Sequence, residues 1–134
     1  MESHDRIAIK LPCKAEYVSV ARLTASGVAN RAGFDLDTVE DIKVAVSEVC
    51  SRIISVAENS SKHYEIDFNI CENKLVINFS SDVKKIDRIF QDDEDGLGMS
   101  IIDAFMDDVE YCPENKSYML SMTKNFEVIS CNGL

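Results

Sequence analysis

Two side chains of opposite charge stand four residues apart in the segment IKVAVSEVCSRIISVA, residues 42–57, whose apolar residues recur at helical spacing. Glu48 and Arg52 therefore project from the same face of the predicted helix, where they can form an ion pair. A guanidinium has five donors and no acceptor, so Arg52 cannot ligate a cation, although it can contact a phosphate. The spacing favours the ion pair, and direct phosphate contact is the alternative.

A second candidate is the run Gly96-Leu97-Gly98 at the predicted start of a later helix. Glycines at such a position allow backbone N–H groups to face an anion at the positive end of the helix. The alternative is an ordinary turn from a loop into a helix. The acidic run at residues 92–95 would repel phosphates, although acidic residues near a helix start also stabilise the helix.

The chain carries a strong negative charge, with 24 acidic against 14 basic side chains and a formal net charge of -10. This charge repels the phosphate backbone of nucleic acid and anionic membrane surfaces, so we expect neither as a direct partner. The five cysteines are far apart and form no CxxC pair, which argues against a zinc site and a disulfide framework. With no leader-like segment and no long apolar run, the sequence predicts a soluble cytoplasmic protein.

The sequence predicts one domain over residues 1–134, because no linker, repeat or low-complexity stretch divides it. Alternating apolar and polar residues predict an edge strand over Arg6–Leu11. Helical spacing follows from Val18 to Ala32, and Gly33 is a natural C-cap. A second helix is predicted from about Asp37, which would cap it together with Glu40 in a capping box. The buried stripe of that helix would consist of Ile42, Val46, Val49, Ile53 and Val56.

Five further elements are predicted in the second half, namely strands Tyr64–Cys71 and Leu75–Ser81, a helix from about Leu97 to Met106, and strands Val109–Cys112 and Ser117–Thr123. The resulting order is β-α-α-β-β-α-β-β, which has too few parallel crossovers for a doubly wound sheet. We therefore expect an α+β fold, a two-layer α/β sandwich with a mostly antiparallel sheet and helices on one face. Met99, Met106, Met119 and Met122 are expected to fill the core, and His4 and His63 to be exposed.

Three segments resemble a known family when they are taken in order. These are AEYVSVARLTASGVANRAGFDLDTVEDIKVAVSEVC at residues 15–50, GLGMSIIDAFMDDVEY at residues 96–111, and SMTK at residues 121–124. They are similar to the anti-sigma-B factors of the RsbW and SpoIIAB type, which are small serine-protein kinases of the GHKL ATPase class. The resemblance extends over nearly the whole chain and is weakest between residues 59 and 95.

This resemblance implies a partner-switching protein that uses ATP and magnesium. Such a protein is a homodimer that sequesters a sigma factor and phosphorylates an anti-anti-sigma factor, which phosphorylation then releases. Arg22 matches an arginine that the family uses at the partner-facing surface, although a plain solvated charge is an equal alternative.

The resemblance also assigns roles to individual positions. Glu48 matches the acidic residue that activates the attacking hydroxyl or water. Arg52 stands where the family has a magnesium-binding asparagine, and it has no acceptor atom to offer a cation. This single exchange bears directly on whether the chain can be a kinase.

Of the two further nucleotide boxes, one departs from the family and the other is retained. Asp82 corresponds, with a slip of one residue, to the aspartate that binds the adenine amino group, but Val83 brings a β-branched side chain where a glycine is expected. Gly96 and Gly98 match the phosphate-binding glycines. The stretch between Asp82 and Gly96 is shorter than the usual ATP lid.

Two functions therefore stand beside each other. The favoured one is an anti-sigma factor whose docking surface persists while its kinase site has degenerated. The alternative is an active ATP-dependent serine-protein kinase that tolerates Arg52. A generic dimerisation domain is a weaker third interpretation, because the resemblance is best in the helical region and the GLG segment.

Overall fold

The computed structural model describes residues 5–57, 62–82, 97–111, 113 and 116–126. In chain order the elements are β1 (Asp5–Pro12), the 3-10 turn η1 (Ala15–Tyr17), α1 (Val18–Ala32), α2 (Leu36–Ala57), β2 (His63–Ile70), β3 (Lys74–Ser81), α3 (Leu97–Phe105), β4 (Asp108–Tyr111) and β5 (Leu120–Asn125). The predicted order of strands and helices is therefore confirmed. The predictions that concern His4, Val83, Gly96 and Cys112 fall outside the described residues, as does the cysteine at position 131.

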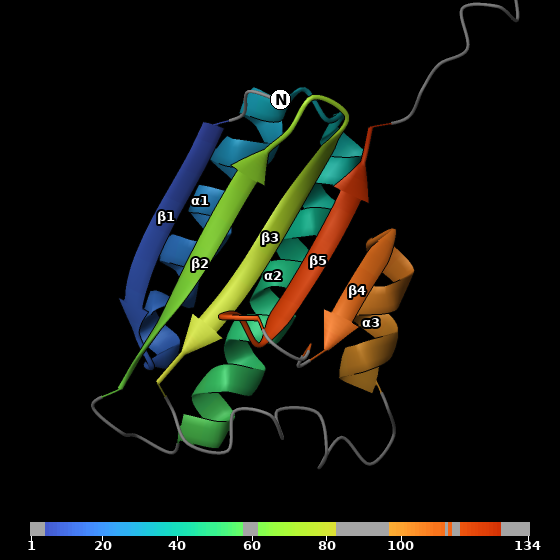
Figure 1. Ribbon diagram of the computed structural model, residues 1–134. Helices are drawn as coiled ribbons and strands as arrows, with labels where there is room; N and C mark the ends of the chain where they lie inside the picture. The colour runs from blue at the N-terminus through green and yellow to red at the C-terminus, as the bar shows by residue number, and fades with distance from the viewer. Residues whose placement is uncertain (1–4, 58–61, 83–96, 112, 114–115, 127–134) are drawn as a thin grey trace, which may run out of the picture.

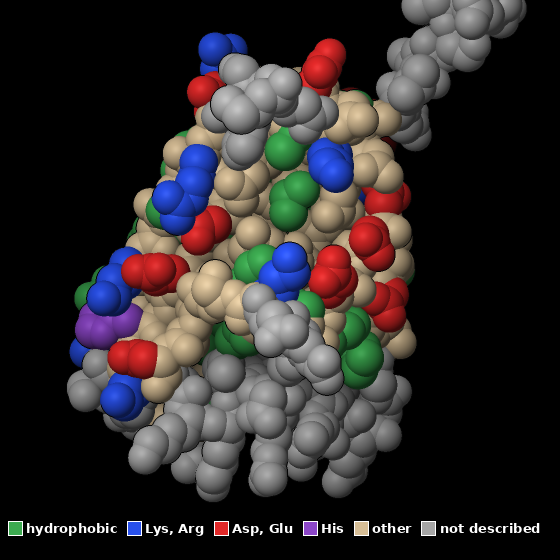
Figure 2. Space-filling view, viewed as in Figure 1, with side chains coloured by type: hydrophobic (Ala, Val, Ile, Leu, Met, Phe, Trp, Pro, Cys, Tyr) green, Lys and Arg blue, Asp and Glu red, His purple; other side chains and the backbone are tan. Residues whose placement is uncertain are grey.

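The five strands form one sheet in the order β1-β2-β3-β5-β4, and every neighbouring pair is antiparallel. Figure 1 shows the three α-helices behind this sheet, all on the same face. The expected two-layer α+β sandwich is confirmed, and β1 lies at an edge as its sequence predicts. Figure 2, seen from the open face of the sheet, shows basic and acidic side chains interspersed.

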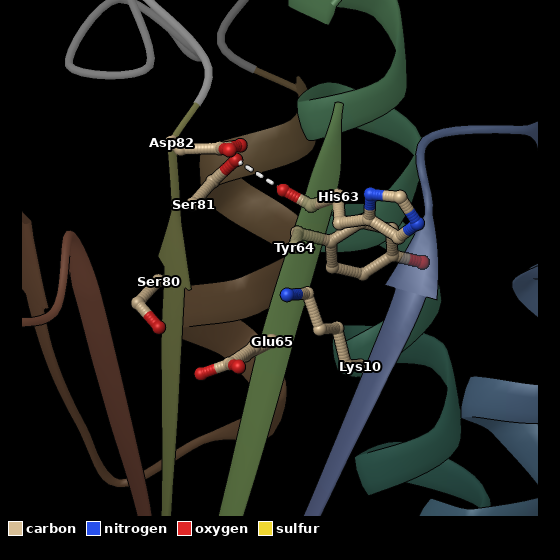
Figure 3. Close-up of a pocket in the computed structure, with 7 residues that line it drawn as sticks. All are labelled: Lys10, His63, Tyr64, Glu65, Ser80, Ser81 and Asp82. Carbon is tan, nitrogen blue, oxygen red and sulfur yellow. Dashed lines mark hydrogen bonds between the residues drawn. The ribbon is translucent and has the colours of Figure 1, made fainter. Parts of the chain in front are cut away.

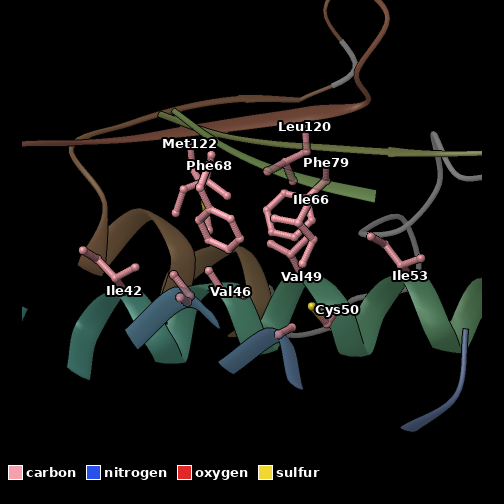
Figure 4. Packing of buried hydrophobic residues seen from close by; sticks show 14 of the residues in the cluster. Ile42, Val46, Val49, Cys50, Ile53, Ile66, Phe68, Phe79, Leu120 and Met122 are labelled. Carbon is pink, nitrogen blue, oxygen red and sulfur yellow. The ribbon is translucent and has the colours of Figure 1, made fainter. Parts of the chain in front are cut away.

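The core lies between the sheet and α2. Along β2, the buried residues Tyr64, Ile66 and Phe68 alternate with residues that point to the open face, as expected for a half-buried strand. Figure 4 shows the apolar side of α2 turned toward the buried side chains of β2, β3 and β5. The predicted buried residues Met106, Met119 and Met122 belong to this core, whereas Met99 is only half-buried.

The predicted stripe of α2 is confirmed at four positions and wrong at one. Ile42, Val46, Val49 and Ile53 are fully buried, but Val56 is only half-buried. Ala57, one residue later, is the buried residue of the last turn. A helix turns by 100° per residue, so a position three residues after Ile53 lies at the margin of the stripe.

Helix α1 ends as its sequence predicts. Gly33 adopts a left-handed conformation with φ of 107°, and its N–H donates to the carbonyls of Ala29 and Asn30. A residue without Cβ occupies this conformation at little cost. Ala21, Ala25 and Ala29 are fully buried, and their small side chains allow α1 to pack closely against its neighbours. The turn therefore places α2 directly beside α1.

The predicted capping residue of α2 is wrong by two positions. The helix begins at Leu36, and the backbone N–H of Thr38 donates to Asp35 Oδ1 at 2.9 Å, which makes Asp35 the N-cap. Asp37 lies inside the first turn. Glu40 does not close a capping box but pairs with Lys43 at 3.1 Å. A cap satisfies the N–H two or three residues later, and Asp35 stands at that distance from Thr38.

Other predicted boundaries shift by one to three residues. β2 and β3 each begin one residue earlier than expected, α3 ends one residue earlier, and β5 runs over Leu120–Asn125 instead of Ser117–Thr123. The position of β5 follows from its pairing, because Leu120 lies opposite Phe79 and Asn125 lies opposite Lys74. Strand ends depend on the partner strand, and local sequence does not specify that partner.

The cap at Asp35 makes the stability of the fold depend on pH. The hydrogen bonds with Thr38 lower the pKa of Asp35 below its ordinary value of 3.8. Its contribution is therefore complete above that value and is lost as the pH falls through the lower, folded-state pKa. We expect Asp35→Ala to lower the thermal midpoint at neutral pH, and to have less effect once the pH has fallen below the folded-state pKa of Asp35.

Thermal unfolding followed by circular dichroism at several pH values checks this expectation. Asp35→Asn is the matched variant, because asparagine also caps a helix but does not titrate. It should keep the thermal midpoint of the wild type at neutral pH. At acid pH it should lack the decrease in midpoint that protonation of Asp35 causes. Asp37→Ala is the positional control. An equal loss in Asp37→Ala and Asp35→Ala would contradict the cap assignment.

Candidate functional site

The structure confirms the ion pair on α2. Arg52 Nε donates to Glu48 Oε1 at 3.1 Å, and the two side chains are 26% and 23% exposed. Val49 and Ile53, on the neighbouring helix positions, are fully buried in the core. Burial of that stripe turns the Glu48–Arg52 edge of the helix away from the sheet and toward α3.

Gly98 brings α3 onto this ion pair. A Cβ atom placed on Gly98 would lie 2.6 Å from Glu48 Oε1 and 2.7 Å from Arg52 Nη2. Carbon atoms do not approach other atoms this closely without displacing them, so the absence of a side chain lets the first turn of α3 rest on the pair. Three of the residues singled out in the sequence are thus neighbours, and Gly98 has a packing role that sequence reasoning missed.

The described residues do not fit a magnesium site. Arg52 offers only donors where a ligand oxygen is needed, and Glu48 Oε1 already accepts a hydrogen bond from it. No cluster of three or more His, Cys, Asp or Glu side chains suited to a metal ion occurs in the described part of the chain. The site therefore differs chemically from a metal-dependent nucleotide site.

Asp82 lies in a different pocket. It follows β3 and lines a hollow of about 300 Å³ with Lys10, His63, Tyr64, Glu65, Ser80 and Ser81 (Figure 3). Ser81 Oγ donates to the carbonyl of His63 at 2.8 Å and ties the ends of β3 and β2 together. His63 is exposed as predicted. None of Glu48, Arg52 and Gly98 lines this hollow, so it does not unite Asp82 with the ion pair.

Arg22 is held in place by the neighbouring helix. Its Nε donates to Ser47 Oγ at 3.0 Å, and Ser47 Oγ donates to the carbonyl of Lys43 at 2.8 Å. Ser47 therefore fixes the guanidinium of Arg22 against α2. This contact joins residues 25 positions apart, and no local signal in the sequence indicates it.

A groove between α1 and α2 contains both Arg22 and Glu48. Its volume is about 320 Å³, and it is lined by Arg22, Glu40, Lys43, Val44, Ser47, Glu48 and Ser51. Val44 is 43% exposed, and Leu23, which follows Arg22 on α1, is 72% exposed. The surface around the groove thus combines exposed apolar side chains with an ordered arginine, a combination found at protein interfaces.

The two buried cysteines Cys13 and Cys50 are not candidate nucleophiles. Cys50 lies between Glu48 and Arg52 in the sequence, but its side chain is fully buried and burial raises its pKa to about 12. Cys13 is 2% exposed, and burial, together with the nearby charge of Asp82, raises its pKa as well. A thiol that stays protonated is a poor nucleophile.

Differential alkylation tests this assignment. Treated in the native state with iodoacetamide at about pH 8, Cys13 and Cys50 should stay unmodified while the half-buried Cys71 reacts. Peptide mass mapping identifies each site, and the denatured chain, in which all three should react, is the control. Modification of Cys50 at the rate of Cys71 would contradict the buried, protonated thiol.

Within the part of the chain that the structure describes, none of the helices could span a membrane.

Residues 11–124 match the family model of the histidine kinase-like ATPase domain. The serine-protein kinase RsbW of Oceanobacillus iheyensis is 39% identical to this chain, across 92% of this chain and 89% of the relative. The proteins of the same name from Bacillus anthracis and Bacillus thuringiensis are 37% and 36% identical, across 92% of this chain and 87% of each relative.

Proposed function

This chain belongs to the RsbW family of histidine kinase-like ATPase domains, and from this premise we propose that it is an anti-sigma factor of a partner-switching system. It binds a sigma factor and an anti-anti-sigma factor in turn, and its kinase site is closed. The observation that carries the proposal is the Glu48–Arg52 ion pair beneath Gly98.

The ion pair opposes kinase chemistry in two ways. A general base must contact the hydroxyl that it deprotonates, and the Arg52 guanidinium, 3.1 Å from Glu48 Oε1, competes with a substrate for that carboxylate. Phosphoryl transfer also depends on metal ions that neutralise the charge of the phosphates. Arg52 has no acceptor atom with which to hold such an ion.

The partner surface in this proposal is the groove between α1 and α2, to which α1 contributes Arg22. Ser47 orders the Arg22 side chain before a partner arrives, which reduces the entropy lost on binding. Val44, which lines the groove, and Leu23, which follows Arg22 on α1, supply apolar area that a partner would cover. We further propose that the chain is a cytoplasmic homodimer, as the family resemblance implies.

Regulation without phosphorylation relies on competition. An anti-anti-sigma factor that binds the same surface displaces the sigma factor according to the two affinities and concentrations. Release of the sigma factor is then reversed when the antagonist is diluted or lost, and no phosphatase is required.

An active serine-protein kinase is the second candidate. It is favoured by the retention of Glu48 and Gly98, and by the name of the relatives, serine-protein kinase RsbW. This function requires Arg52 to leave Glu48 when Mg-ATP binds. Water and phosphate oxygens would then complete the coordination of magnesium.

Thermal-shift titration separates the two candidates. We expect Mg-ATP and Mg-ADP to leave the midpoint of the wild type unchanged, because the ion pair occupies the site. A ligand at about one hundred times its dissociation constant would add about 2.7 kcal/mol, a shift of several degrees for a domain of this size. Arg52→Asn, which restores an acceptor, is the comparison. Stabilisation of the wild type, with transfer of phosphate to a cognate antagonist, would establish the kinase instead.

Binding measurements test the groove. We expect Arg22→Ala to weaken binding of a purified cognate sigma factor by about 2 kcal/mol, or about thirtyfold, because an ordered arginine at an interface is a frequent hot spot. Arg31→Ala is the matched control, since Arg31 is an exposed arginine of the last turn of α1 that does not line the groove. Equal binding by Arg22→Ala and the wild type in calorimetry would refute the docking surface.

A further inference from the structure

Helix α3 is attached to the rest of the fold at identifiable points along its length. Ile102 is fully buried in the core at the middle of the helix. At the end, Lys124 Nζ donates to the carbonyl of Phe105 at 2.9 Å, and Asp107 N donates to the carbonyl of Thr123 at 2.9 Å. In the first turn, Leu97 is 57% exposed, and Gly98 presents its backbone to the neighbouring helix.

The first turn of α3 meets α2 at the ion pair. The Cβ position of Gly98 lies within 2.9 Å of three atoms, and all three belong to Glu48 or Arg52. The backbone of α3 therefore packs directly on the paired carboxylate and guanidinium. A hydrophobic contact has no preferred direction, whereas a hydrogen-bonded ion pair has a defined geometry. The ion pair therefore restricts the position of the first turn of α3 more closely than an apolar contact would.

Electrostatics explain why both members of the pair are needed. The start of a helix carries partial positive charge, so the carboxylate of Glu48 is favourable beside it and the guanidinium of Arg52 alone is not. Pairing neutralises the guanidinium and fixes the carboxylate near Gly98. Loss of Arg52 frees Glu48 to rotate toward water, and loss of Glu48 leaves a cation beside the positive end of α3.

We propose that the Glu48–Arg52 ion pair is an internal latch that holds the first turn of α3 against α2 without any bound nucleotide or metal. In this arrangement Arg52 provides within the chain the positive charge that a metal ion would otherwise bring to the site. The latch concerns the pair on which the proposed function rests, but it makes a separate claim about the placement of α3.

Hydrogen exchange of the full-length chain, read by mass spectrometry, tests the latch. Peptides that cover residues 97–106 report on α3, and peptides from β2 and β3 report on global unfolding. In the wild type we expect α3 to be protected without ligand and Mg-ATP to add no protection. Arg52→Gln should speed exchange in α3 by about tenfold while exchange in β2 and β3 stays unchanged.

Two glycine variants provide a second, independent test. Gly98→Ala should also speed exchange in α3, because its Cβ must displace either the ion pair or the helix. Gly27→Ala is the matched control, since a Cβ on Gly27 meets nothing within 4 Å and alanine is the better helix former. Arg6→Gln removes the Arg6–Asp67 pair on the sheet and controls for the loss of an ion pair in general.

The proposal is overturned if α3 exchanges at the wild-type rate in Arg52→Gln and Gly98→Ala, or if only α2 responds, which would reduce the pair to a local helix contact. Protection of wild-type α3 by Mg-ATP would also overturn it. These outcomes are distinct from failure of the proposed function. Phosphate transfer to an antagonist would refute the proposal that the kinase site is closed. Unchanged hydrogen exchange of α3 in the variants would refute the latch, even if the protein transfers no phosphate.

Discussion

The burial of one stripe of α2 against the sheet is the constraint on which the rest of the molecule depends. Ile42, Val46, Val49 and Ile53 are fully buried, so the rotation of the helix about its axis is determined. Every polar residue of α2 then has a defined direction. Ser47 faces α1, while Glu48 and Arg52 lie under the first turn of α3. The site is thus a consequence of core packing.

The chemistry of the site follows from one side chain. An asparagine at position 52 would bring an oxygen acceptor, whereas the guanidinium brings only donors and a permanent positive charge. The nearest acceptor on the same helix is Glu48, four residues earlier, and the two side chains are partly buried. A metal-dependent kinase and an internal ion pair therefore compete for the same carboxylate, and the described geometry favours the ion pair.

The groove and the ion pair are close neighbours on α2. Ser47 holds Arg22 on the groove side, and Glu48, the next residue, lines the same groove while it accepts a hydrogen bond from Arg52. A partner that presses on Arg22 therefore contacts a helix turn that also supports α3. The serine-protein kinase activity for which the relatives are named and the proposed docking function would therefore both depend on this short stretch of α2.

Much of the fold was predictable because its signals are local. Alternation in β2, the helical spacing of α1 and α2, and Gly33 as a C-cap all depend on residues within a few positions of one another. The pairing of Glu48 with Arg52 was predictable for the same reason, since a helix brings residues four apart together. The errors, at Asp35, Val56 and the ends of β5, concern boundaries where neighbouring elements decide.

The sequence by itself determined the order of the elements, the α+β class and the ion pair within α2. Only the tertiary structure decided that Gly98 rests on that pair, that Ser47 orders Arg22, and that Asp82 lines a separate hollow. The physical reason is separation along the chain. Contacts within a helix follow from its repeat, but contacts between residues 25 or more positions apart depend on how whole elements pack.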